Sequence, residues 1–120
     1  MVEDKAMNWK ELTEGEVHII RLSGEIDLQH SPEMRQLLHE KANKSVPAIL
    51  LDFSEVKYID SSGLATLVEY YQKSRGYSGQ IALAGMNNRV RSVFDLVRLN
   101  EIFPIYPSEA EARASFQARA

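Results

Sequence analysis

Residues 48–53, Ala48-Ile49-Leu50-Leu51-Asp52-Phe53, and residues 60–64, Asp60-Ser61-Ser62-Gly63-Leu64, decide the fold of this chain. The first run is short and almost continuously apolar, as expected for a central strand that is buried on both faces. Beyond Leu64, apolar side chains recur three, four and seven residues further on, which predicts a helix from residues 60–62 to about Gly76. Residues 54–59 are then expected to form the loop between strand and helix.

The segments on either side continue an alternation of strand and helix patterns. Two apolar segments flank the turn-like Thr13-Glu14-Gly15-Glu16, which predicts an antiparallel strand pair. Ser31-Pro32 is typical of an N-cap followed by proline at the first helical position. Pro104 cannot donate a hydrogen bond to a sheet, so its strand is expected at an edge. The expected elements are strands at 7–12 and 17–22, a helix at 32–44, a strand at 80–84, a helix capped by Asn87 or Asn88, a strand at 102–106, and a last helix opened by the capping-box pattern Ser108-Glu109-Ala110-Glu111.

Strands and helices that alternate along a chain build a mostly parallel sheet with right-handed crossovers. The sequence therefore predicts the α/β class, with a mixed, mostly parallel sheet of four or five strands and four helices. A chain of 120 residues, 44% of them hydrophobic, can build one ordinary core. Residues 1–120 contain no internal repeat, low-complexity segment or linker, so a single domain is expected.

Composition makes several classes of partner improbable. The formal net charge is only -3, so the chain lacks the basic footprint of a nucleic-acid-binding protein. Its longest apolar stretch, Val46 to Leu51, is far shorter than the ~20 residues that cross a bilayer, and we expect no membrane insertion. The acidic N-terminus lacks a secretory signal pattern and there is no cysteine, which together favour a cytoplasmic location.

The sequence also lacks the residue patterns of common enzymes and metal sites. His18, His30 and His39 show neither a spacing of four residues nor nearby cysteines, so no metal site is expected. No nucleophile elbow, Walker-type phosphate loop or dinucleotide fingerprint occurs. We therefore assign no catalytic residue and no cofactor. A small nucleotide-binding hydrolase that uses Ser61 or Asp60 is the enzyme hypothesis, and nucleotide turnover by the purified protein would support it.

The segment Asp60-Ser61-Ser62-Gly63 is the candidate functional site, because it lies where open α/β sheets place their ligands, at the carboxyl side of the central strand. A plain N-cap explains Asp and Ser at this point equally well. Gly63, however, costs ~1 kcal/mol of helix propensity relative to alanine, which suggests a close backbone approach. A serine here would also lie near unpaired N–H groups and the positive end of the helix dipole, which favours a phosphate.

Three segments of the sequence resemble one known family. Residues 51–64, Leu51-Asp52-Phe53-Ser54-Glu55-Val56-Lys57-Tyr58-Ile59-Asp60-Ser61-Ser62-Gly63-Leu64, look like the signature segment of STAS domains, as found in bacterial anti-sigma factor antagonists. Leu22-Ser23-Gly24-Glu25-Ile26-Asp27 is similar to their Gly-Glu-Leu-Asp turn, and residues 90–97 resemble their third helix. Order and spacing match along roughly residues 8–118. The resemblance implies the STAS fold.

The resemblance also implies a function. In that family the serine directly after the aspartate accepts a phosphate, and here that residue is Ser61. The unphosphorylated chain is then expected to bind a GHKL-type serine kinase that doubles as an anti-sigma factor, which releases a sigma factor. Phosphorylation by that kinase ends binding, and a PP2C-type phosphatase reverses it. Asp27, Asp60, Ser62 and Gly63 are the expected partner contacts.

The chain departs from the commonest family pattern at Leu28-Gln29-His30 and at Ala65, where a second glycine is frequent. These departures bear on which partner is bound. An alternative within the same family is a STAS subunit of a lipid-transport ABC ATPase complex, which would bind its ATPase constitutively. Ser61 would then be a contact and not a switch.

Overall fold

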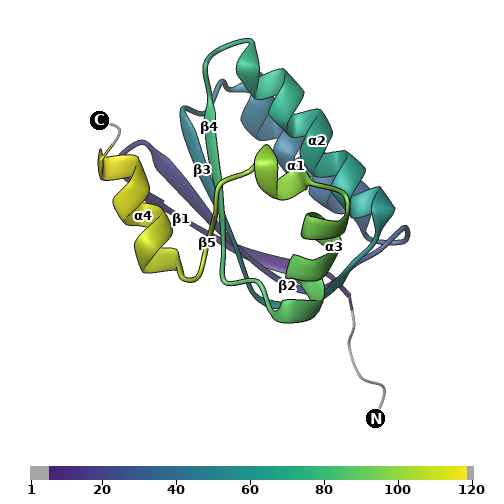
Figure 1. Ribbon diagram of the computed structural model, residues 1–120. Helices are drawn as coiled ribbons and strands as arrows, with labels where there is room; N and C mark the ends of the chain where they lie inside the picture. The colour runs from purple at the N-terminus through teal and green to yellow at the C-terminus, as the bar shows by residue number, and fades with distance from the viewer. Residues whose placement is uncertain (1–5, 119–120) are drawn as a thin grey trace.

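The computed structural model describes residues 6–118 and alternates strands and helices as the sequence predicts (Figure 1). The strands and helices within these residues are β1 (Asn8–Glu14), β2 (Val17–Ile26), α1 (Ser31–Asn43), β3 (Ala48–Ile59), α2 (Ser61–Arg75), β4 (Gln80–Ala84), α3 (Asn88–Leu96), the short 3-10 helix η1 (Leu99–Glu101), β5 (Ile105–Tyr106) and α4 (Glu109–Ala118).

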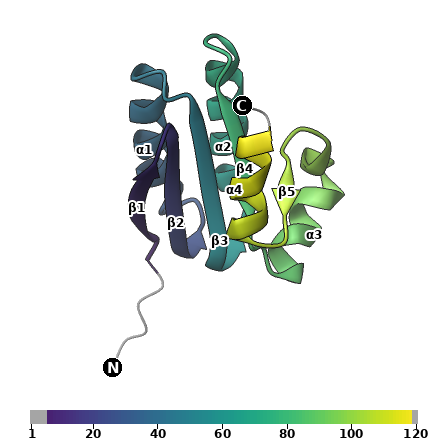
Figure 2. The ribbon, with the colours of Figure 1, turned by 90° about the vertical axis from the view of Figure 1, so that its left-hand side faces the viewer.

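Across the described residues the strands form one five-stranded sheet in the order β1-β2-β3-β4-β5. The β1 and β2 pair is antiparallel, and every later neighbour pair is parallel. Each parallel strand is added on the same side of the preceding one, so right-handed crossovers place the connecting helices on one face. Helices α1, α2 and α3 accordingly cover one face of the sheet, while α4 lies on the other (Figure 2).

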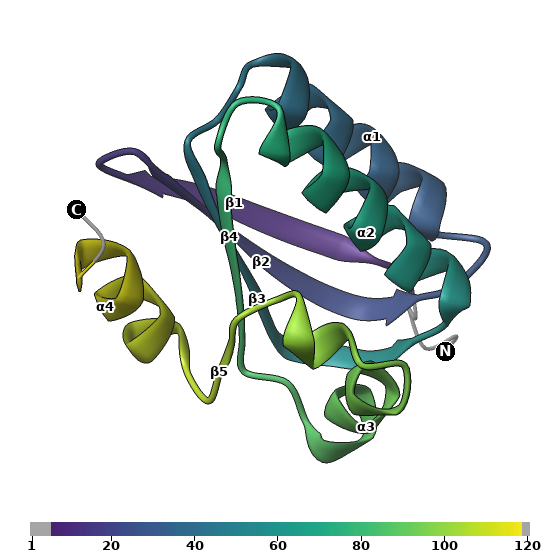
Figure 3. The same cartoon turned by 45° about the horizontal axis from the view of Figure 1, so that its top comes forward.

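The two cores follow from side-chain alternation along β3. Ile49, Leu51 and Phe53 point toward the larger core, which they share with α1, α2 and α3. Ala48 and Leu50 point to the opposite face, where Phe116 and its neighbours on α4 pack against them. Figure 3 shows α4 separated from the other helices by the sheet. The strand is therefore buried on both faces, as the apolar run predicts.

Several boundaries differ from the predicted ones. Residues 54–59 are not a loop, because β3 runs on to Ile59 and pairs there with the end of β2 across irregularities in register. The last strand covers only Ile105–Tyr106 and not 102–106, because the N–H groups of Ile102 and Phe103 donate back to the carbonyl of Leu99 at the 3-10 helix. Its place at the sheet edge, next to β4, is as predicted.

The start of α1 also differs in detail from the prediction. Ser31 is already helical, and the N-cap is His30, whose side chain makes no capping hydrogen bond. The other predicted caps are confirmed, with Asn87 accepting from the N–H of Val90 and Ser108 from the N–H of Glu111. None of the helices between residues 6 and 118 is long and apolar enough to cross a membrane.

Candidate functional site

Asp60 organises the site at the start of α2. It is the N-cap, and its Oδ1 accepts hydrogen bonds from the N–H groups of Ser62 at 2.9 Å and Gly63 at 3.3 Å. Its Oδ2 accepts from the N–H of Leu28 at 3.1 Å. Burial raises the pKa of the Asp60 carboxyl, but the hydrogen bonds from the Ser62 hydroxyl and from these N–H groups outweigh it and hold the pKa below its ordinary value. A helix start close to Ser61 is thus confirmed.

The two serines after Asp60 lie in different environments. The Ser62 hydroxyl donates a hydrogen bond of 2.6 Å to Oδ1 of Asp60, so its proton and position are fixed by the cap. Ser61 is exposed, and its hydroxyl makes no hydrogen bond with any described residue. Consecutive helical residues point about 100° apart, which accounts for the difference. Of these two serines, only Ser61 presents a hydroxyl that no described residue holds.

The close approach suggested by Gly63 is present, and it involves the protein's own core. A Cβ at Gly63 would lie 2.8 Å from side-chain carbons of both Ile26 and Ile59. These two isoleucines are buried at the neighbouring ends of β2 and β3. The glycine therefore lets the first turn of α2 sit directly on the sheet. A contact between Gly63 and a partner stays a prediction.

Asp27 lies beside the Asp60 cap, as the sequence predicts for the loop after β2. The N–H of Asp60 donates to the carbonyl of Ile26 and the N–H of Leu28 donates to the Asp60 carboxylate, so the two loops are hydrogen-bonded together. Asp27 Oδ1 accepts from the N–H of His30 at 3.0 Å and contacts Nδ1 of that ring at 2.7 Å. Asp27 therefore supplies the side-chain capping contact that His30 lacks.

Leu28 is the residue of this site that sequence reasoning undervalued. Its side chain is 76% exposed, although its N–H is held by Asp60. A large apolar side chain left in water on a loop that is fixed by hydrogen bonds is a typical contact for another protein. The signal in the sequence was the departure at residues 28–30, but periodicity alone could not show that Leu28 points outward.

The geometry corrects one part of the argument for a phosphate at this helix start. The N–H groups of Ser62 and Gly63 are not unpaired, because the Asp60 carboxylate already accepts from both. The N–H of Leu64 donates to the carbonyl of Asp60. A group attached to Ser61 would therefore face solvent at the positive end of the helix dipole.

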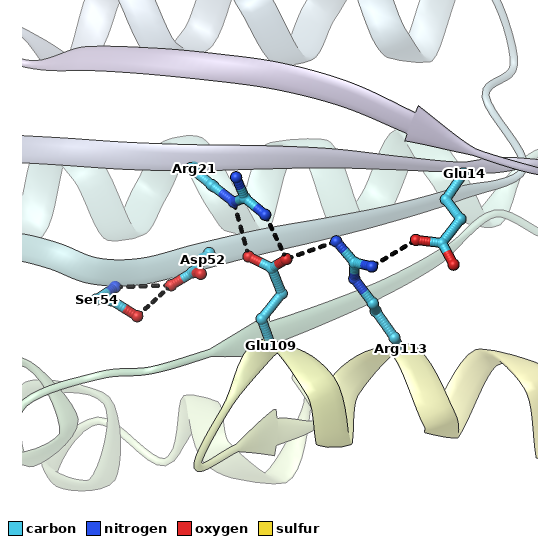
Figure 4. A network of polar contacts seen from close by, with 6 residues as sticks. All are labelled: Glu14, Arg21, Asp52, Ser54, Glu109 and Arg113. Atoms are coloured by element: carbon cyan, nitrogen blue, oxygen red, sulfur yellow. Dashed lines mark hydrogen bonds and ion pairs between the residues drawn. The ribbon is translucent and has the colours of Figure 1, made fainter.

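A second polar cluster, which the sequence did not predict, ties α4 to the sheet (Figure 4). Glu109 accepts two hydrogen bonds from Arg21, at 2.9 and 3.0 Å, and one from Arg113 at 2.7 Å. Arg113 also bonds Glu14, and the buried Asp52 beside this group accepts from Ser54. The capping-box pattern at residues 108–111 gave no indication of this role of Glu109.

The carboxyls of Asp52 and Glu109 titrate in opposite directions. Burial and the adjacent Glu109 raise the pKa of Asp52, against the hydrogen bonds from Ser54. The bonds from Arg21, together with those from Asp52 and Arg113, lower the pKa of Glu109 to about 2 despite its burial. Asp52 therefore keeps its proton to a higher pH than an ordinary aspartate does, while Glu109 stays ionised next to two guanidinium groups.

The histidines lie apart from one another. Nδ1 of His18 contacts Lys41 and Nδ1 of His39 contacts Lys73, whereas Nδ1 of His30 contacts Asp27. No group of three or more His, Asp or Glu side chains that could hold a metal ion occurs within the described part of the chain.

Comparison with known proteins agrees with this fold and this sequence order. The family model described as the STAS domain matches residues 9–112, and the chain therefore belongs to the STAS domain family. It is 32% identical over 98 residues to the anti-sigma F factor antagonist of Paenibacillus polymyxa, which covers 80% of this chain and 83% of the relative. It is 29% identical over 92 residues to the anti-sigma-B factor antagonist of Listeria monocytogenes, with 77% and 81% covered.

Solved structures give the same result. An anti-sigma factor antagonist from Mycobacterium paratuberculosis superposes with a TM-score of 0.86 at 25% identity, covering 96% of this chain and 97% of that one. The anti-sigma factor antagonist SpoIIAA in its unphosphorylated form superposes with a TM-score of 0.80 at 23% identity, covering 94% and 97%. The predicted STAS fold and family are confirmed.

Proposed function

We propose that this chain is an anti-sigma factor antagonist whose binding is controlled by phosphorylation of Ser61. In the unphosphorylated form it binds a GHKL-type serine kinase that also acts as an anti-sigma factor, and a sigma factor is released. Phosphorylation of Ser61 by that kinase ends binding, and a PP2C-type phosphatase restores it. The names of the similar proteins support the regulatory role and give no support to an enzyme.

The observation that carries the proposal is the contrast between Ser61 and Ser62. A kinase must reach a hydroxyl that is exposed and not already donating elsewhere. The Ser61 side chain meets both conditions, whereas the Ser62 hydroxyl is held by the Asp60 carboxylate at 2.6 Å. The titration of Asp60 adds to this, because a carboxyl with a lowered pKa stays ionised and keeps Ser62 engaged at physiological pH.

Electrostatics explain how a phosphate would end binding. A phosphoserine adds about -1.5 to -2 charges at neutral pH. On Ser61 that charge would be added next to the Asp60 carboxylate, which already accepts from the N–H groups of Ser62 and Gly63, so these two groups are not available to neutralise it. A partner docked on this surface would have to bury an uncompensated charge, at a cost of several kcal/mol. A two-state reversal requires ~5.5 kcal/mol, so one phosphate suffices to change the population.

The partner surface combines an apolar and an acidic part. Leu28 offers exposed apolar area, its N–H donates to the Asp60 carboxylate, and Asp27 precedes it in the chain. A complementary partner therefore presents an apolar pocket bordered by a basic side chain. This combination gives both attraction to the unmodified surface and sensitivity to added negative charge.

The experiment that tests the proposal uses the purified chain, its cognate kinase and ATP. We expect Ser61→Ala to bind the kinase but to accept no phosphate, and Ser61→Asp to fold normally and bind poorly. Ser62→Ala is the matched control, and it should keep substantial phosphorylation. Phosphopeptide mass spectrometry and a pull-down give the readouts. Phosphate on Ser62, or unchanged phosphorylation of Ser61→Ala, would overturn the assignment. Constitutive capture of an ABC-type ATPase would show that the partner is that ATPase and not the proposed kinase.

A further inference from the structure

The strand β1 exposes one complete side to solvent. It pairs with β2 from Asn8↔Ser23 to Glu14↔Val17, and no other strand among residues 6–118 lies along its opposite side. Figure 2 shows β1 as the outermost strand, with helix α1 behind the sheet and not along its edge. The strand has no proline and no irregularity in its pairing with β2. Such an edge is a template for a further strand.

The turn after β1 fixes which backbone groups point outward. Gly15 and Glu16 form a two-residue connection, and Gly15 has φ of 61°, as the first central position of a type II′ turn requires. Glu14 and Val17 are therefore a hydrogen-bonded pair, and such pairs alternate along an antiparallel ladder. The backbone N–H and C=O groups of Leu12 and Lys10 therefore point toward β2 and form hydrogen bonds with it. The N–H and C=O groups of Thr13, Glu11 and Trp9 point away from the sheet.

We propose that two copies of this chain associate through their β1 edges, antiparallel to each other, with Leu12 facing Leu12 of the second copy. In this register Glu11 lies opposite Thr13, and both residues have outward backbone groups, so four inter-chain hydrogen bonds form. Lys10 lies opposite Glu14 on each side of the two-fold axis, which gives two ion pairs on the same face as Leu12. The result is one continuous sheet through two protomers.

The neighbouring registers are unfavourable. Moving the axis from Leu12 to Glu11 places Glu11 opposite Glu11, and moving it to Lys10 places Lys10 opposite Lys10, so like charges meet at the axis in each. Moving it the other way, to Thr13, leaves only residues 12–14 of the two strands facing each other. Each of these shifts loses both Lys10–Glu14 ion pairs. Registers that place an odd-numbered residue opposite an even-numbered one are excluded, because the side chains of these residues point to opposite faces of the sheet. The charges and the length of this edge therefore favour the register centred on Leu12 over its neighbours.

The arrangement is compatible with the candidate site. Glu14 already accepts from Arg113 of α4, so its carboxylate is held on the face where Lys10 of the second copy arrives. Ser61 follows the end of β3, in the interior of the sheet order and two strands away from this edge. Both copies of Ser61 thus stay accessible in the dimer, and loss of dimerisation would leave the proposed phosphorylation of Ser61 unaffected.

Disulfide trapping tests the register, because the chain contains no cysteine and each single-cysteine variant can therefore cross-link only through the introduced residue. Leu12 occupies a non-hydrogen-bonded position on the axis, where Cβ atoms lie about 4.5–5.5 Å apart and a disulfide fits. We expect L12C to form a dimer under mild oxidation, and K10C and E11C to do so far more slowly. Fastest trapping of K10C or E11C would mean a different register and would overturn the proposed one.

Sedimentation equilibrium from about 0.01 to 1 mM, the range suited to a small interface, tests the association itself. K10E and E14K should each be monomeric alone, since residues 10 and 14, which face each other across the axis, then carry the same charge. The two variants should dimerise when mixed, because opposite charges then face each other again. T13P removes an outward N–H that β2 does not use, so it should lose the dimer while keeping its circular dichroism spectrum. A wild-type chain that stays monomeric throughout, or variants that dimerise like the wild type, would refute the proposal.

Discussion

Asp27 has a structural role in the fold and, under the proposed function, a second role in partner binding. It holds the turn before α1 by accepting from the N–H of His30, and its carbonyl accepts from the N–H groups of His30 and Ser31. The same carboxylate lies in the loop that is bonded to Asp60, on the proposed partner surface. A simple deletion of the side chain would therefore change stability and binding together.

The variant Asp27→Asn separates the two roles. Asparagine keeps an oxygen acceptor for the His30 N–H and removes the charge, so the melting temperature should stay within about 2 °C of the wild type while kinase binding weakens by about tenfold or more. Asp27→Ala should in addition lose about 1 kcal/mol of stability, as the loss of a cap typically does. Calorimetry and a binding titration give both readouts. Wild-type affinity in Asp27→Asn would assign this residue a purely structural role.

At the level of elements, the anchoring of α4 depends on a carboxylate with an unusual titration. Glu109 has a folded pKa of about 2, below its ordinary value of 4.5. Its contribution to stability is therefore complete above pH about 4.5 and is lost as the pH falls toward 2. We expect Glu109→Gln to lower the melting temperature at pH 7 by about 5 °C, with the difference vanishing near pH 2. Glu111→Gln on the same turn is exposed and serves as the control.

The contribution of Asp52 to stability depends on pH in the opposite direction. Its raised pKa means that the folded protein favours the protonated carboxyl, so its contribution is complete below the ordinary pKa and is lost as the pH rises through the raised one. Asp52→Asn keeps the acceptor for Ser54 and cannot ionise. It should therefore raise the melting temperature at pH 8 by a few degrees and change it little at pH 3. A pH-independent effect would show that Asp52 stays ionised in the fold.

The same elements show how far the sequence could predict the structure. The helix at Ser61 and its Asp60 cap were predictable, because apolar spacing and capping residues act over one turn. The extension of β3 to Ile59 was not, because its polar residues pair only with the end of β2, which lies more than twenty residues upstream. The Glu109 cluster was missed for the same reason, since Arg21 and Glu109 are 88 residues apart in the chain.

For the whole molecule, the architecture separates the candidate site from the parts that stabilise the fold. The larger core lies under α1, α2 and α3, and α4 is anchored by a polar cluster on the other face of the sheet. Ser61 is exposed at the beginning of α2, outside both cores. The proposed phosphate on Ser61 would therefore act on a surface outside both cores, where it could change binding without rearranging the domain.

This separation leads to the last prediction, that phosphorylation of Ser61 leaves the fold intact. The phosphate would face solvent, because Asp60 already occupies the N–H groups of Ser62 and Gly63, and the helix dipole partly offsets repulsion from the Asp60 carboxylate. The melting temperature should therefore change by less than about 3 °C. Amide NMR shifts should change only in the first turn of α2 and in the loop at residues 27–30, which is bonded to Asp60. Shifts that spread into β4 or α4 would instead mean that phosphorylation works through a conformational change, and the electrostatic account of the switch would then be wrong.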